Sequence, residues 1–187
     1  MQPVSRADIV DYQTYEDQRG AFRRDVMVAK AARRVHLGEH VTLLFENRLT
    51  VRYQIQEMMR VEQIVKEESI QHELDTYNEL LGGPGQLGCS LLIEIEDAAE
   101  RGPLLSKWLG LPQSAYVKLR DGTRVYAQFD PRQVGEDRLS AVQYMKFDTG
   151  GQVPDAVGVD HPELTAETAL SADQRSALES DLAATRS

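Results

Sequence analysis

Residues 45–62 read FENRLTVRYQIQEMMRVE, and this stretch decides the fold because it joins a predicted strand to a predicted helix. The preceding segment, residues 40–46, alternates apolar and polar residues and is rich in β-formers, which predicts a strand. Asn47 is a favoured N-cap residue, and residues 48–65 carry apolar side chains at helical spacing. We therefore expect a strand that leads directly into a long amphipathic helix.

The rest of the chain alternates between the same two patterns. Helices are expected from Ser5, where Asp8 completes a capping box, to a break at Gly20, and then over residues 21–35, 67–81 and 98–110. Strands are expected over residues 89–96, on both sides of the Asp121–Gly122 turn, and over residues 141–147. Because the helices cluster before most of the strands, we expect an α+β fold with about five mostly antiparallel strands and four or five helices.

The composition changes near Thr149 and predicts two regions. Residues 1–149 are expected to form a single α+β domain. Residues 150–187 contain seven acids and two arginines among small and polar residues, so we expect an acidic, mobile tail with a short exposed helix near its end. A functional interpretation of this tail is a peptide that docks on a partner.

Charge and composition exclude several classes of protein. The formal net charge of -9 argues against nucleic acid as a partner, because phosphate binding needs a basic surface. No apolar run approaches the roughly 18 residues of a membrane span. The N-terminus lacks the apolar core of a secretory signal, which predicts a cytoplasmic location. Cys89 is the single cysteine, and its apolar surroundings predict a buried, inert thiol.

The predicted helix after Asn47 has polar residues on its apolar side. Thr50, Gln54, Glu57 and Glu62 all fall among apolar positions of the helical wheel, whereas Gln56 falls on the face expected to meet solvent. A buried carboxylate costs several kcal/mol unless it is paired or binds a metal. These residues should therefore have partners.

Arginine is the nearest available cation in the sequence. Arg33 shares a helical face with apolar residues, so we expect a buried network of Arg33 with Glu57, Gln54 and Glu73. Two interpretations stay open: a structural ion network without a ligand, or a site that binds a ligand or a metal.

Three kinds of chemistry fit such a site. Glu57, Glu62 and Glu73 could hold a hard cation such as iron or manganese. Glu57 could act as an acid or base, because burial raises the pKa of a carboxyl group, with Arg33 or Arg34 holding an anionic substrate. The backbone at the start of the predicted helix, with Glu46, Asn47 and Arg48, could bind an anion. No phosphate-binding loop or nucleophile motif is present, and no cofactor is indicated.

Residues 45–58, together with ELDTYNELL (73–81), SLLIEIE and AVQYMKF, resemble a bacterial family described only as a domain of unknown function. The resemblance covers residues 5–148. The resemblance implies no activity or ligand. Proteins of this kind are often encoded beside rubrerythrin-like and iron–sulfur proteins, which implies a link to redox or peroxide defence. The family's characteristic residues match the following positions: Phe45, Glu46, Asn47, Arg48, Thr50, Gln54, Gln56, Glu57 and Met58.

Three functions follow as hypotheses. The first is a non-catalytic accessory protein that binds a redox partner or a small ligand through the polar cluster. The second is an enzyme that uses Glu57 on an anionic substrate. The third is an iron-binding protein that uses Glu57, Glu62 and Glu73.

Overall fold

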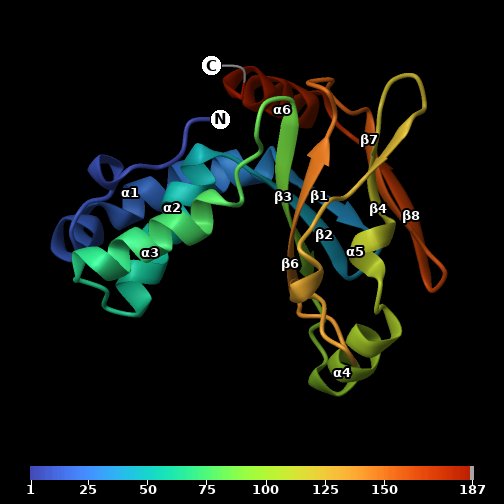
Figure 1. Ribbon diagram of the computed structural model, residues 1–187, viewed down its shortest axis with the longest axis horizontal. Coiled ribbons are helices and arrows are strands. Elements are labelled where there is room, and N and C mark those ends of the chain that lie inside the picture. Colours follow the sequence, from blue (N-terminus) through green and yellow to red (C-terminus); the bar gives the residue numbers. More distant parts are fainter. Residues whose placement is uncertain (186–187) are drawn as a thin grey trace.

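The computed structural model describes residues 1–185 and contains two antiparallel sheets of four strands and two groups of helices (Figure 1). Sheet A has the order β1 (Arg34–Leu37), β2 (Val41–Glu46), β3 (Gln86–Ile93), β6 (Val142–Asp148). Sheet B has the order β5 (Arg124–Tyr126), β4 (Ala115–Lys118), β7 (Ala156–His161), β8 (Leu164–Ala169). The predicted α+β class is confirmed, with more strands than expected.

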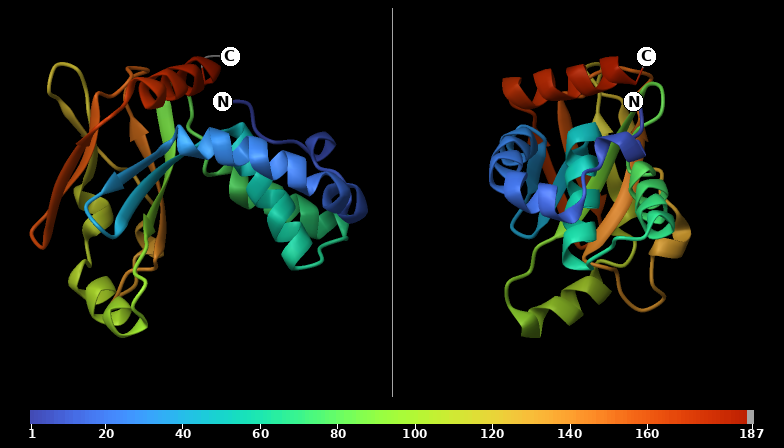
Figure 2. Two further views of the ribbon diagram at one scale, coloured as in Figure 1. Left: turned by 180° about the vertical axis from the view of Figure 1, so that it is seen from behind. Right: turned by 90° about the vertical axis from the view of Figure 1, so that its left-hand side faces the viewer.

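The helices fall into two groups. Three of them form an arm that projects away from sheet A, as the views in Figure 2 show: α1 (Tyr12–Ala31), α2 (Arg48–Val61) and α3 (Glu67–Asn78). The others lie beside the sheets: α4 (Ala98–Lys107), α5 (Leu111–Ser114) and α6 (Ala172–Ala184). Within residues 1–185, none of the helices combines the length and the apolar character that crossing a membrane requires.

Each part has its own hydrophobic core. In the first core, side chains of sheet A such as Leu43 and Phe147 pack with Val157 of sheet B and Leu182 of α6. The second core holds the arm together, and Ile55 of α2 packs there with Leu74 of α3. The arm can therefore keep its shape while standing away from the sheets.

The strands expected near residues 40–46, 89–96 and 141–147 are confirmed, and so is the hairpin around Asp121–Gly122. The N-terminal helices differ from the expectation. The capping box of Ser5 starts only a short 3-10 helix, Arg6–Asp8, and α1 runs unbroken through Gly20. It does so because its residues Tyr15 and Val26 are buried, and this burial outweighs the low helix propensity of a glycine.

The end of α1 also differs. The helix was expected to reach residue 35, but it stops at Ala31, and Val35 lies in β1. Residues 34–37 pair with β2 instead of continuing the helix, and this pairing places Val35 opposite Leu43. The strand pairing therefore outweighs the local helical pattern.

Residues 150–185 do not form the mobile tail that their composition predicts. They form β7, β8 and α6, and β7 lies inside sheet B between β4 and β8. The acidic side chains that suggested a tail form ion pairs with cations elsewhere in the chain: Asp160–Arg124, Glu163–Lys107, Glu167–Lys118 and Asp181–Arg33. Net charge was misleading because it does not reveal these pairs. The expected short helix is present as α6, and its Leu178 and Leu182 are buried rather than exposed.

This placement of α6 predicts a large effect of a small change near the C-terminus. Leu182→Ala should lower the free energy of unfolding by about 2–5 kcal/mol, because it leaves a cavity at a fully buried site. Val28→Ala, at a side chain that is 73% exposed, is the control and should change it by less than about 0.5 kcal/mol. Urea denaturation measures both, and equal effects would contradict the packing of α6.

Candidate functional site

The arm joins sheet A where β2 leads into α2, and this junction holds a buried polar network. Glu46, at the end of β2, accepts hydrogen bonds from Thr50 Oγ1 at 2.5 Å and from Ser90 Oγ of β3 at 2.7 Å. Asn47 caps α2 by accepting a hydrogen bond from the Thr50 backbone N–H. The predicted N-cap is thus confirmed, and the carboxylate beside it is satisfied by two hydroxyl groups.

A buried ion pair ties α6 to the same junction. Arg33, just after α1, donates two hydrogen bonds to Asp181 of α6, at 2.7 and 2.9 Å. Asn47 Nδ2 lies 3.3 Å from the same carboxylate. The two charged side chains are only 10% and 8% exposed, so each depends on the other for its solvation. We call Arg33, Glu46, Asn47, Thr50, Ser90 and Asp181 the junction network.

Lys30 lies within the electrostatic field of the junction network, and no carboxylate among residues 1–185 forms an ion pair with it. Its ammonium group lies 5.2 Å from the centre of the Tyr53 ring. Burial lowers the pKa of Lys30, and the charge of Glu46 partly offsets this effect. Lys30 therefore interacts with the network through its electrostatic field and with the arm through a cation–π contact.

Glu57 belongs to a second cluster, so the expected pair of Arg33 and Glu57 is wrong. Arg19 of α1 binds Glu57 with two hydrogen bonds of 2.7 and 2.9 Å, Tyr15 donates a third of 2.7 Å, and Arg60 lies 3.7 Å away. The Arg19 guanidinium lowers the pKa of the Glu57 carboxyl, against the expectation that burial raises it. The same carboxylate, together with burial, raises the pKa of Tyr15.

The helical wheel predicts Gln56 on the solvent face of its helix. This prediction is wrong, because Gln56 is only 1% exposed. Its side chain accepts a hydrogen bond from the Val10 N–H and donates one to the Val10 carbonyl. Asn78 likewise accepts a hydrogen bond from the Val4 N–H and donates one to the Val4 carbonyl. The N-terminal segment, residues 1–10, therefore covers a face of the arm that a helical wheel leaves open.

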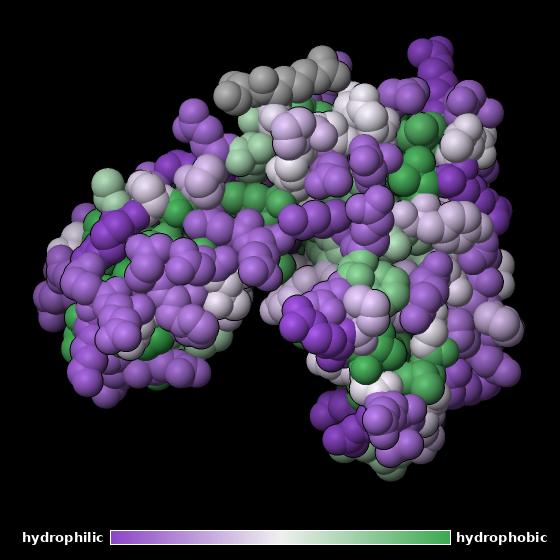
Figure 3. Space-filling model, viewed as in Figure 1, coloured by the Kyte–Doolittle hydropathy of each residue, from purple (hydrophilic) through white to green (hydrophobic). Residues whose placement is uncertain are grey.

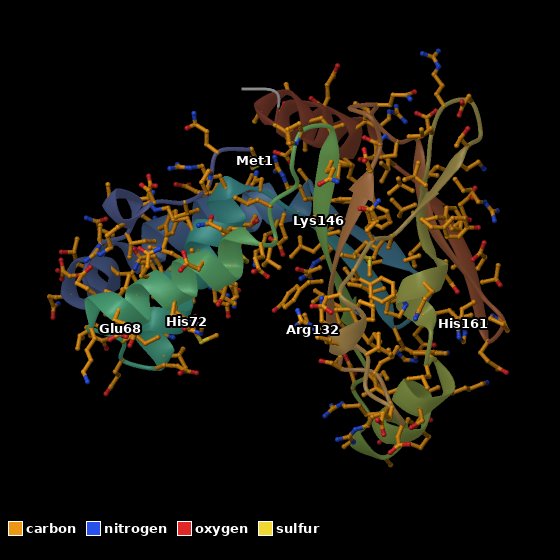
Figure 4. The ribbon with its side chains drawn as sticks, viewed as in Figure 1. Met1, Glu68, His72, Arg132, Lys146 and His161 are labelled. Atoms are coloured by element: carbon orange, nitrogen blue, oxygen red, sulfur yellow. The ribbon has the colours of Figure 1, made fainter. Side chains whose placement is uncertain are left out.

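The remaining predicted residues lie apart from one another. Arg34 is 3.9 Å from Glu94, Arg48 pairs with Asp8, and Gln54 is partly exposed. Glu62 and Glu73 line a surface depression between the end of α2 and α3, which the side chains of His72 and Glu68 share (Figure 4). Residues 1–185 contain no group of three or more His, Cys, Asp or Glu side chains arranged to bind a metal.

A pocket of about 570 Å³ lies in the cleft between the arm and sheet A, which is visible as a hollow in Figure 3. Tyr77 and Leu80 line it from the arm side, and Tyr144 and Lys146 of β6 line it from the sheet side. Burial and the neighbouring Tyr77 and Glu46 raise the pKa of Tyr144. The Lys146 ammonium, labelled in Figure 4, has no hydrogen-bond or ion-pair partner among residues 1–185.

Sequence reasoning missed this pocket because its walls come from the end of α3, from residues 128–133 and from β6. The signal available in the sequence was that the strand carries apolar residues on both faces. In the structure Met145 and Phe147 are buried on one face, whereas Val142 and Tyr144 are 39% and 37% exposed on the other.

Two glycines bring the arm close to sheet A. A Cβ atom on Gly88 of β3 would lie 1.8 Å from the carbonyl oxygen of Leu80, and one on Gly82 would lie 2.2 Å from the carbonyl oxygen of Gln86. Only glycine permits these approaches of backbone to backbone. The loop between α3 and β3, residues 79–85, therefore brings the base of the arm into contact with sheet A.

Comparison with known proteins shows the family of this chain. Residues 3–182 match the model of a family described as protein of unknown function, DUF3501. The chain belongs to this family. Family membership confirms the expected resemblance to an uncharacterised domain and extends it over residues 150–182.

A solved structure of known origin is similar over nearly the whole chain. It is the crystal structure of a novel protein of unknown function from Burkholderia pseudomallei, 29% identical, with a TM-score of 0.88 over 97% of this chain and 100% of that chain. A search of curated proteins gives no match. These relatives support the family and the fold, and they carry no activity over to this chain.

The junction network predicts that the stability of the fold depends strongly on the Arg33–Asp181 ion pair. Asp181→Asn should lower the free energy of unfolding by about 3–5 kcal/mol, because it leaves the Arg33 charge buried without a counter-ion. The double variant Arg33→Met with Asp181→Leu should recover most of this loss. Glu67→Gln, which removes the exposed pair with Arg6, should have a far smaller effect. A loss in the double variant equal to that in Asp181→Asn would contradict the pairing.

The Glu57 cluster predicts a pH-dependent contribution to stability. The folded-state pKa of Glu57 lies below the ordinary value of 4.5, so its stabilising effect is full above that pH and disappears as the pH falls through the folded value. Glu57→Gln should therefore be about 1–3 kcal/mol less stable than the native protein at pH 7, with a deficit that shrinks below pH 4.5. Denaturation at several pH values measures this, and Glu68→Gln is the exposed control. A deficit that stays constant down to pH 2 would disprove it.

Proposed function

We propose that this protein is a non-catalytic binding protein whose ligand or partner enters the cleft between the arm and sheet A. The observation that carries the proposal is the pocket lined by Tyr77, Tyr144 and Lys146, whose ammonium group has no hydrogen-bond or ion-pair partner among residues 1–185. Concave sites with apolar walls and a few polar groups are the usual form of ligand sites, and the volume of about 570 Å³ is within their range.

The polar clusters support this choice because their groups already have partners inside the chain. The carboxylates of Glu46, Asp181 and Glu57 each accept at least two hydrogen bonds from neighbouring side chains. A ligand at these positions would have to replace satisfied contacts. We therefore assign the junction network and the Glu57 cluster to structural roles and the cleft to binding.

The resemblance described above suggests the first partners to test, namely rubrerythrin-like and iron–sulfur proteins. A small ligand is the alternative occupant of the same cleft. The cytoplasmic location and the redox association stay predictions.

The enzymatic hypothesis fits the geometry less well. A general acid that works near neutral pH needs a raised pKa, whereas Arg19 lowers the pKa of Glu57. The iron-binding hypothesis needs Glu57, Glu62 and Glu73 around one ion, but Arg19 and Tyr15 occupy the oxygens of Glu57.

The cleft variants Tyr144→Ala and Lys146→Met test the proposal. Each should weaken the binding of a purified rubrerythrin-like partner, measured by isothermal titration calorimetry. Tyr144→Ala should reduce the binding free energy by about 2 kcal/mol, because it removes an aromatic side chain from the centre of the contact. Tyr12→Ala, at a tyrosine of α1 that is 43% exposed, is the matched control and should leave the affinity unchanged. Native mass spectrometry of the purified protein tests the small ligand with the same variants. Binding that is lost equally in Tyr12→Ala, or in neither cleft variant, would refute the assignment.

A further inference from the structure

Strand β6 is the edge of sheet A, and its outer side is only partly paired. On its inner side it forms a continuous antiparallel ladder with β3. On its outer side Lys146 exchanges two backbone hydrogen bonds of 2.8 Å with Gln128, as one step of a second antiparallel ladder. The next outward-facing residue along this edge is Tyr144.

At Tyr144 a side chain takes the place of a strand. The Tyr144 N–H donates to Gln133 Oε1 at 2.9 Å, and Gln133 Nε2 donates to the Tyr144 carbonyl at 3.4 Å. The chain has left the edge in the short 3-10 helix Pro131–Gln133, so the amide group of Gln133 makes the two contacts that a peptide group would make. Beyond it, the Val142 N–H donates to the nearby Ser140 hydroxyl at 3.3 Å and to no other group among residues 1–185.

The same stretch of edge forms one wall of the cleft pocket. Gln128, Gln133, Tyr144 and Lys146 all line it, opposite Tyr77 and others on the arm. A chain lying along β6 would therefore place alternate side chains into an apolar space formed by Tyr77, Leu80 and Phe129. Backbone pairing and a side-chain pocket thus occur side by side, which is the combination that strand-addition sites use.

We propose that the occupant of the cleft is an extended peptide segment of a partner protein, which adds to β6 as an antiparallel strand and displaces the amide of Gln133. This inference rests on the proposed function and specifies the kind of partner. When the site is empty, the Gln133 amide makes the hydrogen bonds that the Tyr144 N–H and carbonyl need. It thereby also disfavours pairing of this edge with other chains. Binding exchanges its two hydrogen bonds for those of a strand.

A library of random dodecapeptides displayed on phage is the probe, selected on the native protein and on Gln133→Ala. We expect the selected peptides to bind Gln133→Ala at least about tenfold more tightly than the native protein, because two competing hydrogen bonds are removed. Gln152→Ala, at an exposed glutamine, is the control and should bind like the native protein. Fluorescence anisotropy measures the affinities.

Two further readouts separate strand addition from other binding. Methylation of single backbone nitrogens in a selected peptide should abolish binding at alternate positions only, since every second N–H of an added strand faces β6. The amide proton of Tyr144 should also remain protected from hydrogen exchange in the Gln133→Ala complex and become exposed in free Gln133→Ala.

Failure of this inference differs from failure of the proposed function. If no peptide is selected, or if selected peptides bind without the alternating pattern and irrespective of Gln133, strand addition is disproved. A ligand or partner that still depends on Tyr144 and Lys146 would then leave the cleft as the binding site. If binding did not depend on Tyr144 and Lys146 either, both the strand-addition inference and the proposed function would be disproved.

Discussion

The ion pair between Arg33 and Asp181 is the contact on which the arrangement of the molecule depends. It joins residues that are 148 positions apart in the sequence, and both side chains are almost fully buried. Arg33 follows the last turn of α1, while Asp181 belongs to the helix that closes the core between the sheets. Through Asn47, the same carboxylate also reaches the start of α2. This buried pair therefore links the end of α1, the start of α2 and α6 at one point of the molecule.

This junction explains why the molecule has a cleft. The arm has its own core and needs contact with sheet A only at its base. There the junction network and the close approach of Leu80 to Gly88 hold it at one angle. The space beyond the base stays open, with aromatic side chains on both walls. The cleft therefore follows from the contact of two separately packed parts at the base of the arm alone.

The polar residues on the apolar side of α2 now have two explanations. Thr50 lies at the joint and satisfies the buried Glu46, whereas Glu57 lies further along the arm and holds α1 through Arg19 and Tyr15. Gln56, on a different face of the helix, holds the N-terminal segment through two hydrogen bonds with the Val10 backbone. Other segments pack against the helix on several sides, so a helical wheel with one buried and one exposed face describes it poorly. Its polar residues hold neighbouring elements together, and we assign binding to the cleft.

The sequence by itself determined the strand before Asn47, the helix after it, the hairpin at Asp121–Gly122 and the need of Arg33 for a partner, because these follow from local periodicity, capping and the cost of burying charge. The tertiary structure alone decided which partner each charge has. Arg33 meets Asp181 and Glu57 meets Arg19, because distant segments come together only in the folded chain. The same reason explains why residues 150–185 contribute to the core. Their small side chains and many acids carry little local signal, whereas in the folded chain β7 pairs with β4, β8 pairs with β7, and cations of other elements pair with their acids.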